Sequence, residues 1–281
     1  MEHPSSSSST ISESAPERDG HADAPRSLPD CYASLVSFAP WLERGGTAAL
    51  MYHKLGPRPP RVRLKGLYVA ERLFRRQLSE LKSAGYDAVD PGALGSQRGA
   101  GLRRIALTFD DGFENVLRLG VGPLREHGFR AIQYLVPGLL GGTNEWEQRQ
   151  GEAVERLMDV SQVRDWLAAG HWIGAHTRTH PWLTRIPLEE AKEEIRSSKR
   201  ALEDLFGVPI RHFCYPYGDW NRPVRDLVEE AGFETACTTH PGANLPAGDR
   251  FLLRRLTARH VSLKWRTLGT WLRVAFLSRR A

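Results

Sequence analysis

Two short strings of acidic and histidine residues carry most of the chemistry that this sequence predicts. Asp110 and Asp111 follow the apolar run 105–107, and His176 and His180 occur later in the chain. Two imidazole nitrogens and one carboxylate oxygen form a usual ligand set for catalytic zinc, which leaves one position open for water. A second carboxylate beside the first can take a proton from that water. We therefore expect Asp111, His176 and His180 to bind a metal ion and Asp110 to act as a base.

Each string alone has a simpler explanation. Asp-Asp-Gly tripeptides are common in loop turns, and two histidines at this spacing can share one face of a helix. The context favours a site, because 172–175 has the pattern of a short buried strand and Pro181 disfavours a helix through His180. Both strings then follow strands, where barrel and open α/β folds place their catalytic residues.

The two strings resemble core motifs of the polysaccharide deacetylases of carbohydrate esterase family 4, also called the NodB homology domain. The Thr-Phe-Asp-Asp-Gly motif is intact at 108–112, and the His-(Ser/Thr)-x-x-His motif is present at 176–180. The resemblance implies the same roles, with Asp110 as the base and the other three residues as ligands. Residues 213–218 resemble a third family motif, an aromatic residue followed by Pro-Tyr-Gly. The resemblance implies that this segment forms one wall of the substrate groove. The groove residues expected there are Tyr215, Pro216, Tyr217 and Gly218.

The third motif departs from the commonest family pattern, which carries arginine where Cys214 stands and proline where Tyr215 stands. The arginine that usually orients the base is therefore missing locally. Arg211 lies three residues earlier, and in an extended segment its side chain would point to the opposite face from Cys214. The sequence leaves open which residue orients Asp110.

The general acid of this family usually follows a late strand, in a Leu-x-His motif. No apolar strand ending in that string follows Gly218, but 48–53 is an apolar strand candidate that ends in His53. The first and last strands of a closed barrel are neighbours, so moving the last strand to the front preserves the site. The chain thus resembles the circularly permuted subgroup that includes poly-β-1,6-N-acetylglucosamine deacetylases, and His53 is the predicted acid. The alternatives are a histidine that only caps a strand, and His240 or His260 as the acid.

Strand-like and helix-like segments alternate from Thr47 onward, which predicts a parallel barrel. Amphipathic spacing predicts helices at 71–81, 115–127, 163–169, 188–206 and 223–231. Strands are expected at 48–53, 88–89, 105–107, 131–136, 172–175 and 235–238. The family resemblance sharpens this fold class to a distorted (β/α) barrel, TIM-like with about seven strands.

Composition predicts three parts in the chain of 281 residues. Residues 1–30 are rich in serine, proline and acidic side chains, so we expect a disordered tail. Residues 31–260 suit one deacetylase domain, and 261–281 form a basic amphipathic segment. That segment either contacts an anionic membrane surface as a peripheral element or packs as a terminal helix.

The expected location is the cytoplasm, with peripheral contact to the inner membrane face through the C-terminal segment. The chain start does not resemble a secretory signal, and no window holds the roughly eighteen apolar residues of a membrane span. The odd set Cys31, Cys214 and Cys237 has no metal-like spacing and suits a reducing compartment.

The expected function is metal-dependent hydrolysis of the N-acetyl group of an amino sugar, of the N-acetylglucosamine type, in a polysaccharide or glycan precursor. Zn²⁺ is the expected metal, and Co²⁺ or Ni²⁺ also suits the ligand set. The net charge of +6 either suits a nucleotide- or lipid-linked precursor or reflects a solvated basic surface, and no nucleic-acid motif is present. Trp146, in the polar insertion 138–159, either stacks on a sugar ring or has an ordinary packing role. The alternative functions are an O-acetyl glycan esterase, a small-metabolite deacetylase and a non-catalytic glycan-binding barrel.

Overall fold

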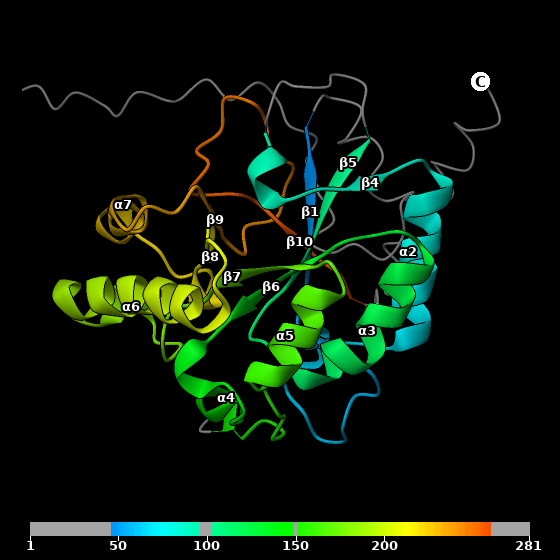
Figure 1. Cartoon of the computed structure of the whole chain (residues 1–281), viewed down its shortest axis with the longest axis horizontal. Helices are drawn as coiled ribbons and strands as arrows, with labels where there is room; N and C mark the ends of the chain where they lie inside the picture. The colour runs from blue at the N-terminus through cyan, green and yellow to red at the C-terminus, as the bar shows by residue number, and fades with distance from the viewer. Residues whose placement is uncertain (1–45, 96–102, 149–150, 260–281) are drawn as a thin grey trace, which may run out of the picture.

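A parallel sheet with helices packed around it forms the centre of the molecule (Figure 1). The structure is a computed structural model that describes residues 46–95, 103–148 and 151–259. The strand order is β10-β1-β5-β6-β7-β8-β9, with β4 also paired to β5. The strands of this sheet are β1 (Ala48–Tyr52), β4 (Asp87–Ala88), β5 (Arg104–Phe109), β6 (Ile132–Leu135), β7 (Trp172–Ala175), β8 (His212–Cys214), β9 (Thr235–Cys237) and β10 (Leu256–Thr257). β2 (Lys54–Leu55) and β3 (Tyr68–Val69) pair separately.

The first and last strands lie side by side and close the barrel. Leu50 of β1 is in register with Leu256 of β10, and all pairings between strands of the main sheet are parallel. Just before β10, Leu253 bridges Cys237 of β9, and the Thr238 amide donates to the Leu253 carbonyl at 2.9 Å. The segment before β10 therefore joins the β9 side of the sheet to β1, which confirms the distorted (β/α) barrel.

The helices cover the outside of the sheet in two groups. Figure 1 shows α2, α3 and α5 gathered on one side and α6 and α7 on the other. Their bounds are α2 (Glu71–Ser83), α3 (Glu114–Glu126), α4 (Glu145–Gln148), α5 (Val160–Ala168), α6 (Leu188–Phe206) and α7 (Arg222–Glu230). Helix α6 follows Pro187 and ends at Gly207, whose φ of +67° gives the left-handed cap that glycine favours. The five helices predicted from apolar spacing are confirmed.

An aromatic cluster packs behind the strand ends that carry the candidate site. The rings of Tyr52 and Phe109, the last residues of β1 and β5, stack with centroids 5.1 Å apart. Phe74 of α2 contacts both rings edge-on, and the Tyr52 hydroxyl donates to Gln77 at 3.0 Å. Since these side chains are fully buried, the cluster fixes the ends of β1 and β5 relative to each other.

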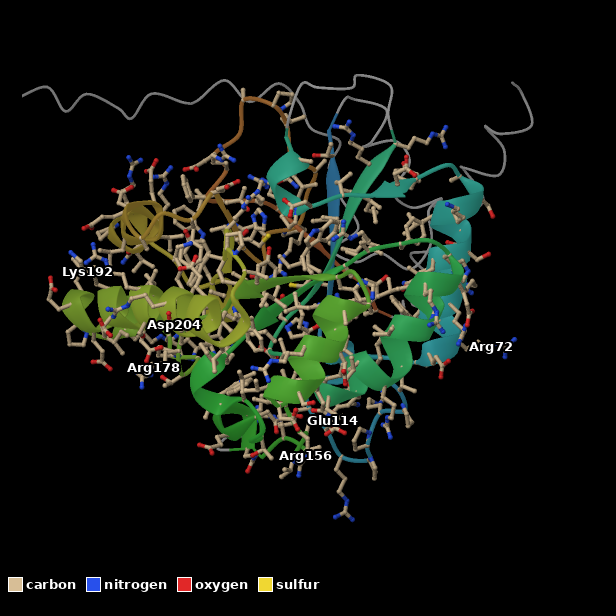
Figure 2. The ribbon with its side chains drawn as sticks, in the orientation of Figure 1. Arg72, Glu114, Arg156, Arg178, Lys192 and Asp204 are labelled. Atoms are coloured by element: carbon tan, nitrogen blue, oxygen red, sulfur yellow. The ribbon has the colours of Figure 1, made fainter. Side chains whose placement is uncertain are left out.

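Charged side chains occupy the outer surface, as the labelled residues of Figure 2 illustrate. Arg156 pairs with Glu114 at 3.3 Å, and Lys192 of α6 pairs with Glu230 of α7 at 3.2 Å. In the described part of the chain, no helix has both the length and the apolar character needed to cross a membrane. The predicted tail (1–30), the predicted basic segment (261–281), Cys31 and His260 lie outside the described residues.

Candidate metal centre and catalytic site

Both acids of the first motif lie at the carboxyl end of β5. The strand ends at Phe109, and the Asp110 amide still donates to the Tyr52 carbonyl at 3.0 Å, which continues the ladder with β1. The backbone then turns through positive φ at Asp111 (+75°), a conformation that costs a non-glycine residue free energy and is often found at functional sites. This turn directs two adjacent carboxylates to different partners, and both are buried.

Asp111, His176 and His180 converge as the sequence predicts. Asp111 Oδ1 lies 3.3 Å from Nε2 of each histidine, and all three side chains are buried. Burial raises the pKa of the Asp111 carboxyl, but hydrogen bonds from His176 and His180 hold it well below its usual range. An ionised carboxylate and two imidazole nitrogens converging on one point fit a divalent ion such as Zn²⁺.

The histidine rings are oriented by neighbouring groups. His176 Nδ1 lies 2.7 Å from the Cys214 carbonyl oxygen, so Nδ1 donates there and Nε2 is the ring nitrogen that faces Asp111. The ring of His180 is stacked on Trp146, with centroids 4.2 Å apart and planes 22° apart. Contacts of this kind fix the ring orientation that a ligand histidine requires.

The loop that carries the histidines is anchored to α6. Glu194 accepts hydrogen bonds from the backbone amides of Arg178 at 2.8 Å and Thr179 at 2.9 Å. The Thr177 hydroxyl accepts one from the His180 amide at 3.0 Å, and both of these residues have positive φ. The side-chain acceptors therefore stabilise a strained loop conformation in which both imidazoles point at Asp111.

Asp110 is held by Arg255, a residue that the sequence analysis missed. Arg255 Nη1 donates to Oδ1 at 2.7 Å and Nη2 donates to Oδ2 at 2.8 Å, and the arginine is fully buried. Burial raises the pKa of the Asp110 carboxyl, but the charges of Arg255 and His53 outweigh this and lower it below its usual value. The signal that could have found Arg255 is the pair Arg254 and Arg255 within the otherwise apolar run 251–256.

His53 follows β1 and faces the same carboxylate. Its Nε2 lies 3.7 Å from Asp110 Oδ2, and its side chain is 15% exposed, so it reaches the cavity while remaining accessible. The rival His240 lies beside Trp220 and is not among the residues that line this cavity. Among the described histidines outside the metal cluster, His53 is the one placed to exchange a proton with a molecule bound near Asp110.

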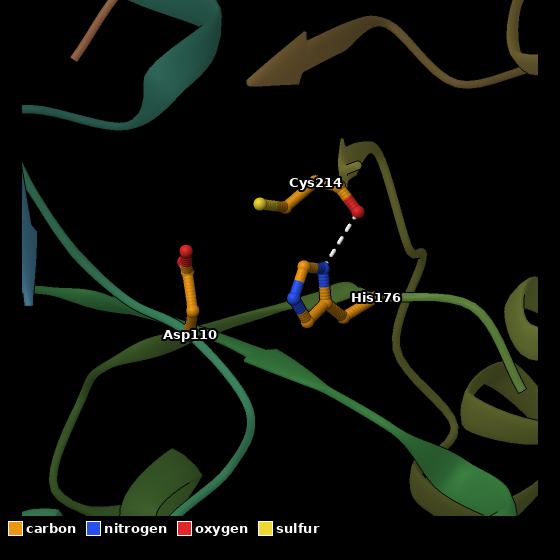
Figure 3. A group of neighbouring side chains, drawn as sticks. All are labelled: Asp110, His176 and Cys214. Carbon is orange, nitrogen blue, oxygen red and sulfur yellow. Dashed lines mark hydrogen bonds between the residues drawn. The ribbon is translucent and has the colours of Figure 1, made fainter. Parts of the chain in front are cut away.

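A second cluster, Asp110, His176 and Cys214, also brings possible ligand atoms together (Figure 3). Most of its possible ligand atoms already accept hydrogen bonds. Arg255 donates to both oxygens of Asp110 and also to Cys214 Sγ, at 3.1 Å. Burial raises the pKa of the Cys214 thiol well above its usual value, whereas metals bind the thiolate. The group around Asp111 is therefore the better metal site.

The site opens into a cavity of about 720 Å³. Of the predicted groove residues, Trp146, Tyr215 and Tyr217 line it, and Trp182 stacks flat on Tyr217 with planes 3° apart. Pro216 lies between Tyr215 and Tyr217 and is buried. Gly218 has a φ of +71° and packs so closely on Thr239 that a Cβ would lie 2.1 Å from its hydroxyl oxygen. The third motif thus forms an aromatic wall supported by a tight turn.

A buried ion pair fixes the helix that carries Trp146. Lys54 of β2 pairs with Glu147 of α4, and both side chains are buried. Asn144 donates to the same Glu147 oxygen at 2.6 Å, and the Lys54 ammonium lies 4.6 Å from the centre of the Phe113 ring. Because Trp146 precedes Glu147, the pair also sets the position of the indole above His180.

The fold and the site together define a (β/α) barrel with a buried His₂-carboxylate cluster and a second, arginine-bound carboxylate. Residues 98–236 match the family model described as "Polysaccharide deacetylase". The chain belongs to the polysaccharide deacetylase family, the NodB or carbohydrate esterase 4 group, whose members are hydrolases. His53 lies outside the matched stretch, so the circular permutation stays a prediction.

Similar proteins agree with this assignment. A chitooligosaccharide deacetylase of Azorhizobium caulinodans is 31% identical over 130 residues, which cover 46% of this chain and 54% of that protein. The chain thus spans about half the length of this curated relative. IcaB from Ammonifex degensii matches the fold with a TM-score of 0.67 at 22% identity, over 80% of this chain and 96% of that one. The Streptococcus pyogenes deacetylase PplD, whose structure was solved in complex with acetate, matches with a TM-score of 0.66 at 22% identity. The match covers 76% of this chain and 92% of that one.

Proposed function

We propose that this protein is a metal-dependent deacetylase that hydrolyses the N-acetyl group of an amino sugar, of the N-acetylglucosamine type, in a polysaccharide or glycan precursor. The observation that carries the proposal is the position of Asp110. It lies in one cavity with the metal cluster around Asp111 and with His53, and Arg255 holds both of its oxygens. Membership of the deacetylase family supports the reaction type.

The residues divide into a metal-binding set and a proton-transfer set. Asp111, His176 and His180 would hold the ion, with Zn²⁺ the best fit and Co²⁺ or Ni²⁺ also suited. When bound, such an ion supplies a Lewis acid that polarises a carbonyl group and acidifies water. Asp110, kept ionised by Arg255, takes the proton of the attacking water, and His53 gives a proton to the departing sugar nitrogen.

The aromatic wall supports a sugar as the substrate. Trp146, Trp182 and Tyr217 contribute flat apolar surfaces to the cavity, and aromatic faces stack well on the apolar face of a pyranose ring. Hydroxyl groups on the other face of such a ring remain free for polar contacts. This arrangement suits an amino sugar better than a small acetylated metabolite.

Acetate release from N-acetylglucosamine oligomers by metal-stripped protein, with and without added Zn²⁺, tests the proposal. We expect release only with the metal, and O-acetylated glycans under the same conditions test the alternative of an esterase. His53→Ala should abolish release and retain one equivalent of metal, whereas His240→Ala, outside the cavity, should behave like the wild type. Full activity of His53→Ala would refute the assignment of the acid and the permutation argument with it.

A further inference from the structure

A basic rim, formed by Arg63, Lys65 and Arg259, lines the opening of the catalytic cavity. Arg63 and Lys65 are exposed, in contrast to the buried carboxylates at the cavity floor. We propose that the basic rim binds a phosphate group carried by the amino sugar. On this inference, which rests on the proposed function, the substrate is a sugar phosphate or a diphosphate-linked sugar and not a neutral polysaccharide.

Two of the three carboxylates of the cavity floor have cations of their own. Asp110 is bound by Arg255 through two hydrogen bonds, and Glu147 is paired with Lys54. Asp111 faces the two histidines of the candidate metal site. The charge of the basic rim is therefore not needed to balance Asp110 or Glu147, and low-dielectric walls extend its potential into the cavity.

The loop that carries Arg63 and Lys65 is held in place through its backbone. Glu152 accepts hydrogen bonds from the amides of Arg63 and Leu64, at 3.1 Å each. The next acid, Glu155, accepts from the Tyr68 hydroxyl at 2.9 Å. The two acidic residues thus fix the backbone of the segment that carries Arg63 and Lys65.

Arg259 reaches the same opening from a distant part of the chain, just after β10. Its side chain lies across Gly66, where an added Cβ would meet Arg259 Cδ at 3.3 Å. Gly66 lies between Lys65 and Leu67, which also line the cavity. Two separate chain segments therefore bring three cations to one edge of the cavity.

Phosphate is the ligand group that uses such an arrangement best. A neutral acetamido sugar offers hydroxyl and amide groups, which gain little from three cations. A phosphate carries up to two negative charges and accepts short, charge-assisted hydrogen bonds from guanidinium and ammonium groups. The cavity volume of about 720 Å³ is within the range of sites that enclose a small ligand.

The test compares kcat/KM for four N-acetylglucosamine compounds at low and high salt. They are the 1-phosphate, the uridine diphosphate conjugate, a short-chain polyprenyl diphosphate conjugate and a neutral oligomer. We expect at least one phosphorylated compound to exceed the oligomer by about tenfold or more, with the advantage reduced at high salt. The best compound then distinguishes a free, a nucleotide-linked and a lipid-linked phosphate.

The variant Lys65→Ala should lower the ratio of kcat/KM for the phosphorylated compound to that for the oligomer by about tenfold. Arg72→Ala is the matched control, because Arg72 is an exposed cation on α2 and lies at the outer edge of the molecule in Figure 2. That control should leave the ratio unchanged. Equal use of all four compounds, with a ratio that does not respond to Lys65→Ala, would overturn the inference and leave the deacetylase intact.

A binding measurement separates this inference from the proposed function. Calorimetric titration of the Asp110→Asn protein with N-acetylglucosamine 1-phosphate does not depend on turnover. We expect binding that weakens when Lys65→Ala is added to the same protein. The titration could show this binding while the metal-loaded wild type releases no acetate from any compound. That pair of results would support the phosphate site and refute the deacetylase. Absence of binding would count against the phosphate site.

Discussion

Asp110 and Asp111 are adjacent in the chain, yet their carboxylates face different groups. Asp110 contacts Arg255 and His53, while Asp111 contacts the two histidines of the metal cluster. The turn through positive φ at Asp111 produces this separation. Two neighbouring carboxylates can therefore take different roles, one as a base and one as a ligand.

Exchanging each aspartate for asparagine should separate these roles. Asp110→Asn should retain one equivalent of metal and lose activity by about a hundredfold to ten-thousandfold, the contribution of a general base. Asp111→Asn should lose the metal. Metal content by atomic emission and acetate release measure the two effects in the same preparations. Loss of metal from Asp110→Asn would show that the two roles are assigned the wrong way round.

Arg255 should affect the pH dependence of turnover. Its charge lowers the pKa of Asp110, so its removal lets that pKa rise. The base must be ionised, so the acid limb of the kcat profile should move to higher pH in Arg255→Met. Arg255→Lys keeps the charge but loses the paired hydrogen bonds, and it should shift the limb less. An unchanged acid limb in a folded Arg255→Met protein would argue against this positioning role.

The residues of the candidate site that share a local motif could be predicted from the sequence, and Arg255 could not. Asp111, His176 and His180 follow strands whose ends meet in any parallel barrel. Arg255 is 145 residues from Asp110, and their contact depends on how the last strand enters the sheet. The stacking of Trp146 on His180 likewise depends on the tertiary structure.

At the scale of elements, the junction between β2 and α4 depends on a buried ion pair. Lys54→Met would leave the Glu147 carboxylate buried without its cation, and we expect a loss of about 3–5 kcal/mol in the free energy of unfolding. Adding Glu147→Leu should recover most of this loss, because it removes the unpaired charge. Urea unfolding measures both effects.

An exposed pair provides the control for this prediction. Arg222 and Asp226 of α7 form an ion pair at 3.0 Å in which both side chains are well exposed. Arg222→Met should change the free energy of unfolding by less than about 1 kcal/mol, as is usual for surface pairs. Equal effects of the two single substitutions would contradict a structural role for Lys54.

The turn between α5 and β7 makes stability depend on pH. His171 is buried against Trp166, and burial together with the charge of Arg130 lowers the pKa of His171 to about 4. The unfolded chain binds this proton near pH 6.5, so stability should fall by up to about 3 kcal/mol as the pH drops from about 6.5 to 4. His171→Phe should make the decrease shallower in unfolding experiments at several pH values. An identical decrease in the variant would assign the effect to other groups.

Long amphipathic helices could be predicted because their apolar spacing repeats over several turns. The prediction for 188–206 coincides with α6, and the other predicted helices differ from the observed ones by a few residues at their ends. The two-residue strands β2, β3 and β10 are too short to show a period. Helix α4 is a single turn, fixed by Glu147 and Asn144, within the segment 138–159 that the sequence indicates only as a polar insertion.

At the scale of the whole molecule, metal binding should be linked to folding. The ligands come from two loops that follow different strands, so the complete site exists only in the folded barrel. Stripping the metal should lower Tm, and Zn²⁺ at about a hundredfold excess over Kd should restore about 3 kcal/mol of stability. Thermal unfolding with and without Zn²⁺ measures this. The Tm of Asp111→Asn should not rise when Zn²⁺ is added. A rise equal to that of the wild type would place the metal elsewhere.

The fold class could be predicted from the alternation of strands and helices, but the closure of the barrel could not. The segment that leads to β10 reaches β1 without a preceding helix, so the alternating pattern gives no signal there. Its position follows from main-chain pairing with β9 and β1 and from the burial of Arg255.

The order in which a ribosome makes this chain separates two stages in the appearance of the site. All three ligands of the candidate metal site around Asp111 have been synthesised once His180 is in place. The guanidinium group that orients Asp110 comes 75 residues later, at Arg255, in the segment that joins β9 to β1. A nascent chain therefore has the proposed metal ligands before it has the arginine that orients the proposed base, and on the proposed function turnover would report that synthesis has passed residue 255 and that the barrel has closed.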